Sequence, residues 1–151
     1  MTDIVLLDTS VYLNVLDVPG FNQDRNAVLD EFQHAIESRG TFLLPLACVW
    51  EAGKHIAQLS DGRKRRDFAE ILVKDVKDAF AGNAPYSPTH FPKRDEFEQW
   101  LDGFPESATQ GKSLADHSLI QEWQRNCDLN PARRVRIWSL DNHLASYDRR
   151  P

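Results

Sequence analysis

The sequence has few cysteines and no long apolar run, and both absences limit what the chain can be. Cys48 and Cys127 are its only two cysteines. Two thiols alone cannot complete a zinc site, so we expect both to be buried and reduced. No apolar run approaches the length that crosses a bilayer, and the first residues, MTD, do not resemble a signal peptide. We therefore expect a cytoplasmic protein that does not enter a membrane.

An excess of positive charge is also missing, since 18 Lys and Arg residues face 23 Asp and Glu residues and give a net charge of −5. This balance argues against binding nucleic acid through overall charge, although a local basic patch or a bound cation can still attract a phosphate. One basic run, Arg63, Lys64, Arg65 and Arg66, either contacts RNA or is the solvated start of a helix. With 151 residues and 41% of them apolar, we expect one globular domain over residues 1–151.

The first apolar run, Ile4–Leu7, is unbroken, which is typical of a strand buried on both faces of a parallel sheet. The run ends on Asp8, and the hydroxyl residues Thr9 and Ser10 follow. Ligands of open α/β sheets bind beyond the carboxyl ends of the strands, so Asp8 is a candidate site residue. The alternative is that Asp8 only caps the next helix, because Asp, Thr and Ser are good capping residues.

Three further carboxylates occupy comparable positions. Glu51 lies in an early turn of a helix that follows a strand, where it can also simply complement the helix dipole. Asp141 follows a late strand. Asp116 shares a helical stripe with Ile120 and Trp123, so it needs a hydrogen bond, a base or a cation as its partner.

The expected strands cover 4–7, 41–44 and 135–138, and the expected helices after the first short one cover 24–40, 46–59, 68–80, 97–104, 114–127 and 143–147.

The longest irregular loop is expected over residues 82–93, which include three prolines. Its aromatic residues Tyr86, His90 and Phe91 allow two interpretations. They can offer RNA bases a stacking surface, or they can pin the loop to the body of the protein. The residues alone leave both interpretations open.

Four carboxylates gathered at one edge of a sheet repel each other unless something neutralises them. The sequence has no cluster of Cys and His that would suggest zinc. An all-oxygen ligand set suits Mg²⁺ or Mn²⁺, and such ions stabilise the attacking and leaving oxygens of phosphodiester hydrolysis. The residues therefore indicate metal-assisted phosphoryl chemistry.

The segments LLDTSVYL, VWEAGK, LADHSLI and WSLDNHL, in this order, resemble the PIN-domain nucleases, notably the VapC-type toxins of bacterial toxin–antitoxin pairs. The resemblance spans Leu6 to Leu144. It implies a single-domain, three-layer α/β fold in which helices flank a central parallel sheet. It also implies cleavage of RNA with Mg²⁺ or Mn²⁺, a small antitoxin protein as partner, and a homodimer.

The same resemblance implies a role for each site residue. The segment between Glu51 and Asp116 is longer than in compact members of the family, so substrate choice and dimer geometry do not carry over with the motifs. The extra length holds the basic run and the proline-containing loop. By position, the acidic quartet is Asp8, Glu51, Asp116 and Asp141, with Asp8, Asp116 and Asp141 as metal ligands and Ser10, Thr9 and Asn142 as polar accessory residues.

Several other functions remain as alternatives. Phosphatases of the haloacid dehalogenase type also begin with a strand and an aspartate, but they need a second acid two residues later, where this chain has Ser10. A receiver domain would need paired acids at the first strand and a late lysine. A PIN fold can also serve as a non-catalytic interaction module or as a housekeeping RNA-processing nuclease.

Overall fold

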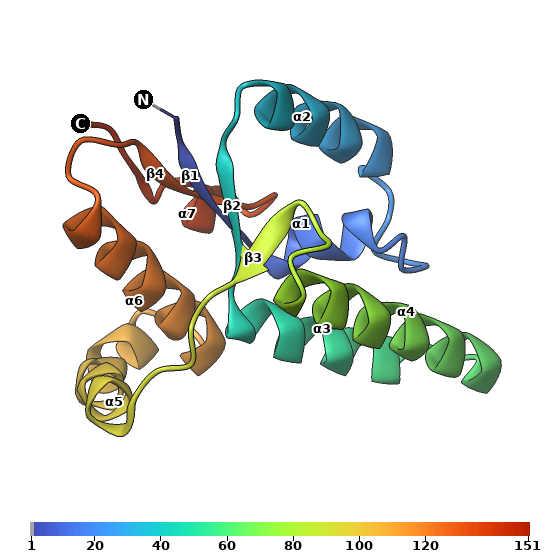
Figure 1. The fold of residues 1–151 in the computed structure, drawn as a ribbon. Coiled ribbons are helices and arrows are strands. Elements are labelled where there is room, and N and C mark those ends of the chain that lie inside the picture. The colour runs from blue at the N-terminus through green and yellow to red at the C-terminus, as the bar shows by residue number, and fades with distance from the viewer. Residues whose placement is uncertain (1) are drawn as a thin grey trace.

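Five strands form one sheet in the order β3-β2-β1-β4-β5 in a computed structural model that describes residues 2–151 (Figure 1). The pairs β1–β2, β1–β4 and β2–β3 are parallel, and β4–β5 is antiparallel. The first strand of the chain is therefore the centre of the sheet, and all four of its residues are buried. The strands are β1 Ile4–Leu7, β2 Thr41–Leu44, β3 Tyr86–Pro88, β4 Val135–Trp138 and β5 Asp148–Arg149.

Helices cover both faces of this sheet and give three layers, as the sequence predicts. Alternate side chains of a strand point to opposite faces, so Val5 and Leu7 pack into the core beneath α1–α4, whereas Ile4 and Leu6 pack beneath α6 and α7. The helix α5 packs on α6 and contributes no fully buried residue. The helices are α1 Thr9–Val15, α2 Arg25–Glu37, α3 Leu46–Ala57, α4 Gly62–Phe80, α5 Arg94–Thr109, α6 Leu114–Leu129 and α7 Asn142–Ala145.

Two strands were not expected, and both lie at edges of the sheet. β3 lies within the segment predicted to be an irregular loop, and it pairs with β2 through only three residues. An edge position tolerates Pro88, which has no N–H to donate. The predicted helix over 143–147 is wrong beyond Ala145, because the chain turns there into β5. The sheet is consequently parallel except at this antiparallel edge.

A partly buried carboxylate, Asp75, joins three elements at the larger core. The hydroxyl of Tyr12 in α1 donates to Asp75 Oδ2 in α4 at 2.6 Å, and the hydroxyl of Tyr86 in β3 donates to the same oxygen. Burial raises the pKa of both tyrosines, and the hydrogen bond to Asp75 raises it further. This arrangement fixes β3 against the helical layer, and it explains why Tyr86 pins its segment instead of offering a stacking surface.

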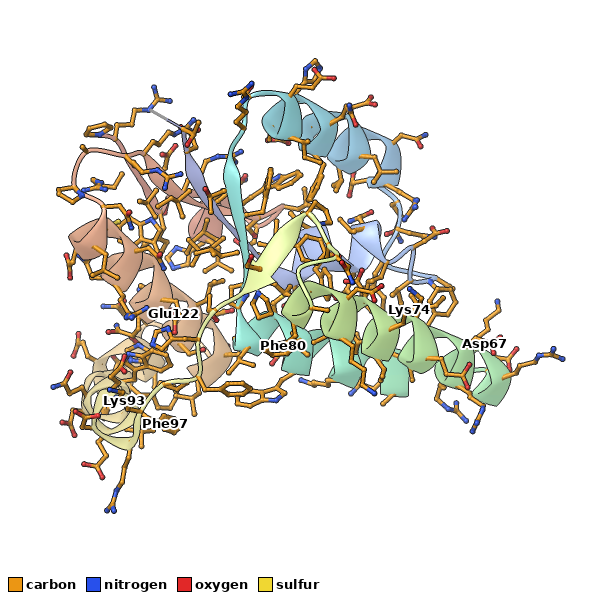
Figure 2. All side chains as sticks on the ribbon, viewed as in Figure 1. Asp67, Lys74, Phe80, Lys93, Phe97 and Glu122 are labelled. Atoms are coloured by element: carbon orange, nitrogen blue, oxygen red, sulfur yellow. The ribbon has the colours of Figure 1, made fainter. Side chains whose placement is uncertain are left out.

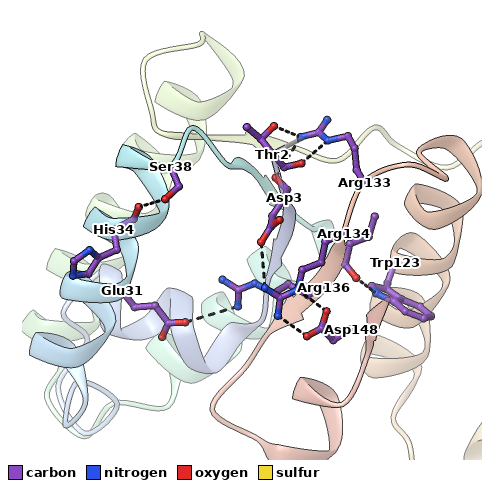
Figure 3. Close-up of polar contacts among 11 residues, drawn as sticks. Thr2, Asp3, Glu31, His34, Ser38, Trp123, Arg133, Arg134, Arg136 and Asp148 are labelled. Carbon is purple, nitrogen blue, oxygen red and sulfur yellow. Dashed lines mark hydrogen bonds and ion pairs between the residues drawn. The ribbon is translucent and has the colours of Figure 1, made fainter. Parts of the chain in front are cut away.

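Arginines of β4 and of the residues just before it lie at the amino end of the sheet (Figure 3). Arg133 donates to the backbone oxygen of Thr2 at 2.8 Å, and Arg134 binds both carboxylate oxygens of Asp148 at 2.8 and 2.6 Å. Arg134 also donates to Asp3, which precedes β1. Since Asp3 and Asp8 stand at opposite ends of β1, the sheet carries its arginines at one end and the candidate acids at the other.

Several smaller expectations can be compared with the structure. Cys48 and Cys127 are buried and free, as predicted. The basic run lies in the exposed first turns of α4, and Figure 2 shows the next residue, Asp67, at the outer end of that helix, so its contact with RNA stays a prediction. Within residues 2–151, no helix is both long enough and apolar enough to span a membrane.

Candidate functional site

Asp8 is held at the carboxyl end of β1 by two serine hydroxyls. Its Oδ2 atom accepts hydrogen bonds from Ser10 Oγ and from Ser139 Oγ, each at 2.8 Å, and a longer one from the backbone N–H of Ser10 at 3.4 Å. The last contact makes Asp8 the N-cap of α1, which confirms the capping interpretation, and a role of Asp8 in chemistry stays a prediction. The three donors fix the orientation of this carboxylate, which is 8% exposed.

The same hydroxyls connect Asp8 to Asp141. Ser10 Oγ accepts from the backbone N–H of Leu140 at 3.0 Å, and Ser139 Oγ accepts from the backbone N–H of Asp141 at 3.0 Å. Asp141 then caps α7 by accepting from the N–H of His143 at 2.8 Å. The ends of β1 and β4 are thus joined by side chains as well as by the sheet. Ser139 was not predicted, although it stands two residues before Asp141 in the quoted WSLDNHL segment.

Asp116 enters the site from the first turn of α6, where its N–H donates to the N-cap Ser113 Oγ at 3.0 Å. The side chain is half-buried, and burial raises its pKa. The charges of Asp8, Asp141 and Glu51 raise this pKa further, whereas the hydrogen bond to Ser113 lowers it. The fully buried residues of α6 include His117, Leu119 and Cys127, which leaves Asp116 at the edge of the apolar stripe and not within it.

The four carboxylates therefore act on each other through their charge, although they come from four separate elements. Among residues 2–151, however, no three His, Cys, Asp or Glu side chains are grouped so that they could hold a metal ion. Their chemistry fits Mg²⁺ or Mn²⁺, because every donor is oxygen. A cation would have to draw the carboxylates closer together than they stand here.

The two weaker polar candidates have different surroundings. Thr9 is partly buried and lies near the Cys48 thiol. Burial raises the pKa of that thiol well above its ordinary value, the charge of Asp8 adds to the rise, and the polar side chain of Thr9 opposes it. Asn142 is the exposed first residue of α7. Thr9 thus supports the base of the site, and the part that Asn142 takes stays a prediction.

An apolar groove of about 370 Å³ opens beside these acids, and we call it the aromatic groove. Glu51 lies on its wall, so the groove shares this one residue with the acidic quartet. One wall is α5, which His117 holds to α6 by hydrogen bonds to the Trp100 carbonyl and to Ser107 Oγ, both 2.7 Å long. Its lining includes Leu46, Trp50, Glu51, Phe91, Phe97, Trp100, Ala115, Ser118 and Glu122.

No family model and no curated protein matches the sequence. Solved structures do match. The structure described as FitAcB from Neisseria gonorrhoeae shares a TM-score of 0.57 and 21% identity over 95% of this chain and 91% of that chain. The structure described as FitAB bound to IR36 DNA fragment shares a TM-score of 0.56 and 20% identity over 95% and 89%. The chain has a PIN-like α/β fold. The predicted fold class is therefore confirmed.

Proposed function

We propose that this PIN-like chain is a cytoplasmic, metal-dependent endoribonuclease and the toxin of a toxin–antitoxin pair. The observation that carries the proposal is that the charges of Asp8, Asp141 and Glu51 raise the pKa of the half-buried Asp116, although the four acids come from separate elements. A cation would relieve that repulsion. The order of the motifs and the fold of the solved structures support the assignment to this class of protein.

In this proposal Asp8, Asp116 and Asp141 hold Mg²⁺ or Mn²⁺, and Glu51 completes the acidic quartet. Such an ion stabilises charge on phosphate oxygens and lowers the pKa of a bound water. Ser10 and Ser139 act through Asp8, since both donate to its Oδ2 atom. Their hydroxyls keep the other side of this carboxylate turned toward the edge of the sheet, where the substrate phosphate would bind.

A non-catalytic interaction module is the main alternative. Clustered carboxylates without a cation destabilise the fold near neutral pH. An interaction module has no use for such a cluster, so the four acids favour the nuclease over this alternative. A housekeeping RNA-processing nuclease would share the chemistry and differ only in its RNA and its partner.

The proposal is tested by incubating the purified protein with a panel of RNAs and the matching DNAs. We expect cleavage of RNA in millimolar Mn²⁺ or Mg²⁺ and none in excess EDTA, because the four carboxylates cannot hydrolyse a phosphodiester without the cation. The variant Asp67→Asn removes an exposed acid at the outer end of α4 and should cleave like the parent. Equal cleavage in EDTA would rule out the metal mechanism.

We also propose a small antitoxin protein that neutralises the acids with a basic side chain. An arginine binds carboxylates with two parallel hydrogen bonds, and the quartet offers four carboxylates. The solved structure of FitAB is itself bound to a DNA fragment, which supports a partner that works together with DNA. Expression of the chain alone should arrest bacterial growth, and co-expression of a small adjacent gene product should restore it. Harmless accumulation of folded protein would contradict the toxin role. The homodimer stays a prediction, which the mass of the purified protein in a sedimentation experiment would test.

A further inference from the structure

Glu122 is a buried carboxylate that the proposed metal chemistry does not use. It lies on α6, is 5% exposed, and lines the aromatic groove, where Figure 2 shows it facing the segment that leads into α5. Its Oε2 atom is buried and has no hydrogen-bond partner among residues 2–151. Since an unpaired buried carboxylate is costly, its retention indicates an occupant that brings N–H donors into the groove.

Positive charge stands close to Glu122 without pairing with Oε2. The pKa of Glu122 is raised, chiefly by burial and further by the charge of Glu96, whereas the positive charge of Arg125 opposes the rise. Arg125 is occupied elsewhere, because it donates to His90 Nδ1 at 2.9 Å and lies 3.8 Å from Glu96. Arg125 therefore opposes protonation of Glu122 without pairing with its Oε2 atom, which has no partner among residues 2–151.

The remainder of the groove is suited to flat aromatic ligands. Trp50 is 71% exposed and Phe91 is 63% exposed, although both are large and apolar. Phe97 and Trp100 line the groove from α5. Exposed aromatic side chains are the surfaces on which single-stranded RNA bases stack. Of the three residues that the sequence suggested for stacking, Phe91 lines this groove and Tyr86 does not, whereas Trp50 and Trp100 line it and were not suggested.

The groove and the proposed acidic site share one residue and one helix. Glu51 belongs to both sites, and Ala115 and Ser118 of the groove wall flank Asp116 on α6. Glu122 follows Asp116 by six positions, which corresponds to roughly 9 Å along a helix. A nucleotide whose phosphate lay at the quartet would reach the groove with its base.

We propose that the aromatic groove binds a guanine base of the RNA substrate and that Glu122 is the residue that selects it. Guanine presents two adjacent donors, N1–H and the exocyclic N2–H, to a carboxylate, and charge-assisted bonds of this kind are strong. Adenine and cytosine offer one amino donor beside a ring-nitrogen lone pair that would face Glu122, and uracil offers one N–H donor between two carbonyl oxygens, so none of the three presents two adjacent donors. This inference rests on the proposed ribonuclease function, which it deepens by naming the base that is recognised.

The test measures binding in EDTA, where cleavage plays no part. Fluorescent heptanucleotides of RNA carry guanine, hypoxanthine or adenine at the central position in an otherwise adenine-only sequence. We expect the guanine oligonucleotide to bind at least about tenfold more tightly than the adenine one, because one or two charge-assisted hydrogen bonds distinguish them. Hypoxanthine, which lacks the N2 amino group, should fall between the two.

The substitution Glu122→Gln should reduce the affinity for guanine to that for adenine, because the amide replaces one acceptor with a donor that opposes N2–H. It removes an unpaired charge, so a melting curve should show an intact fold. Glu70→Gln on α4 changes an exposed glutamate that forms an ion pair with Arg66 across one helical turn and should leave the preference unchanged.

Cleavage by the same proteins in Mn²⁺ separates this inference from the proposed function. Normal cleavage with no preference among the three oligonucleotides would overturn guanine recognition and leave the proposed ribonuclease function intact. Guanine preference in a protein that cleaves no RNA would support the base site and contradict the nuclease. A preference that survives Glu122→Gln would also overturn the inference.

Discussion

Replacing Asp116 by asparagine should lower RNA cleavage by about a thousandfold, the loss expected when one stabilising group of a reaction centre is removed. The same substitution should raise the melting temperature of the metal-free protein near neutral pH. Burial and the charges of Asp8, Asp141 and Glu51 raise the pKa of Asp116 in the folded state. The stability that this group contributes is therefore complete below its unfolded pKa, about 4, and is lost as the pH rises through the folded value.

The size of the stabilisation is limited by solvent. Asp116 is only half-buried, so water screens the repulsion and the penalty at pH 7 is about 1 kcal/mol or less. That corresponds to a rise of roughly 2–4 °C in melting temperature for a chain of this size. Melting curves in EDTA and in millimolar Mn²⁺ measure it, with Asp67→Asn as the control. Mn²⁺ should stabilise the parent more than the Asp116→Asn variant, because the ion binds only the folded site.

One outcome would reassign Asp116. If Asp116→Asn lowers the melting temperature in EDTA, and Mn²⁺ shifts both proteins equally, the carboxylate has a structural role. Asp116 would then serve to stabilise the start of α6, and the proposed acidic site would not include it.

Replacing Asp75 by alanine should destabilise the protein by about 2–5 kcal/mol, the largest effect expected from a residue outside the apolar core. The substitution leaves the hydroxyls of Tyr12 and Tyr86 without their acceptor. Each buried, unsatisfied hydroxyl costs about 1–3 kcal/mol. Chemical denaturation measures the change, and the site should keep its activity at temperatures where the variant is folded.

The neighbouring Asp78 provides the matched control. Asp78→Ala removes an exposed ion pair with Lys74 and should cost no more than about 0.5 kcal/mol. Adding Tyr12→Phe and Tyr86→Phe to Asp75→Ala should restore part of the stability, because no hydroxyl is then left unpaired. In the parent, the raised pKa of both tyrosines means that stability is lost above the unfolded tyrosine pKa, near pH 10. Equal losses for Asp75→Ala and Asp78→Ala would contradict the shared-acceptor arrangement.

The centre of the fold could be predicted from the sequence because its signals are continuous and local. The run Ile4–Leu7 is apolar throughout, and the residue after it is an acid, so both β1 and the position of Asp8 followed directly. The edges of the sheet could not be predicted in this way. β3 has only three residues, including Pro88, and β5 has two, so neither is long enough to show a periodicity.

The site was predicted in part for a related reason. The four acids could be found because each stands at the start or end of an element. Ser139 and Glu122 could not be found, because their importance depends on what approaches them in space. Glu122 looks like an ordinary glutamate on a solvent-exposed face, and only the packing of α5 and residues 89–92 around α6 buries it.

The central position of β1 also determines when the acidic site can exist during synthesis. β1 leaves the ribosome before β4, yet it pairs with β4, and Asp8 receives a hydrogen bond from Ser139, 131 positions later in the chain. Contacts between such distant segments form late, after the cost of closing the intervening loop has been met. A nascent chain therefore carries Asp8 and Glu51 before Asp116 and Asp141 have been made. If the proposed function holds, this topology delays activity until β4 and the residues after it have been synthesised.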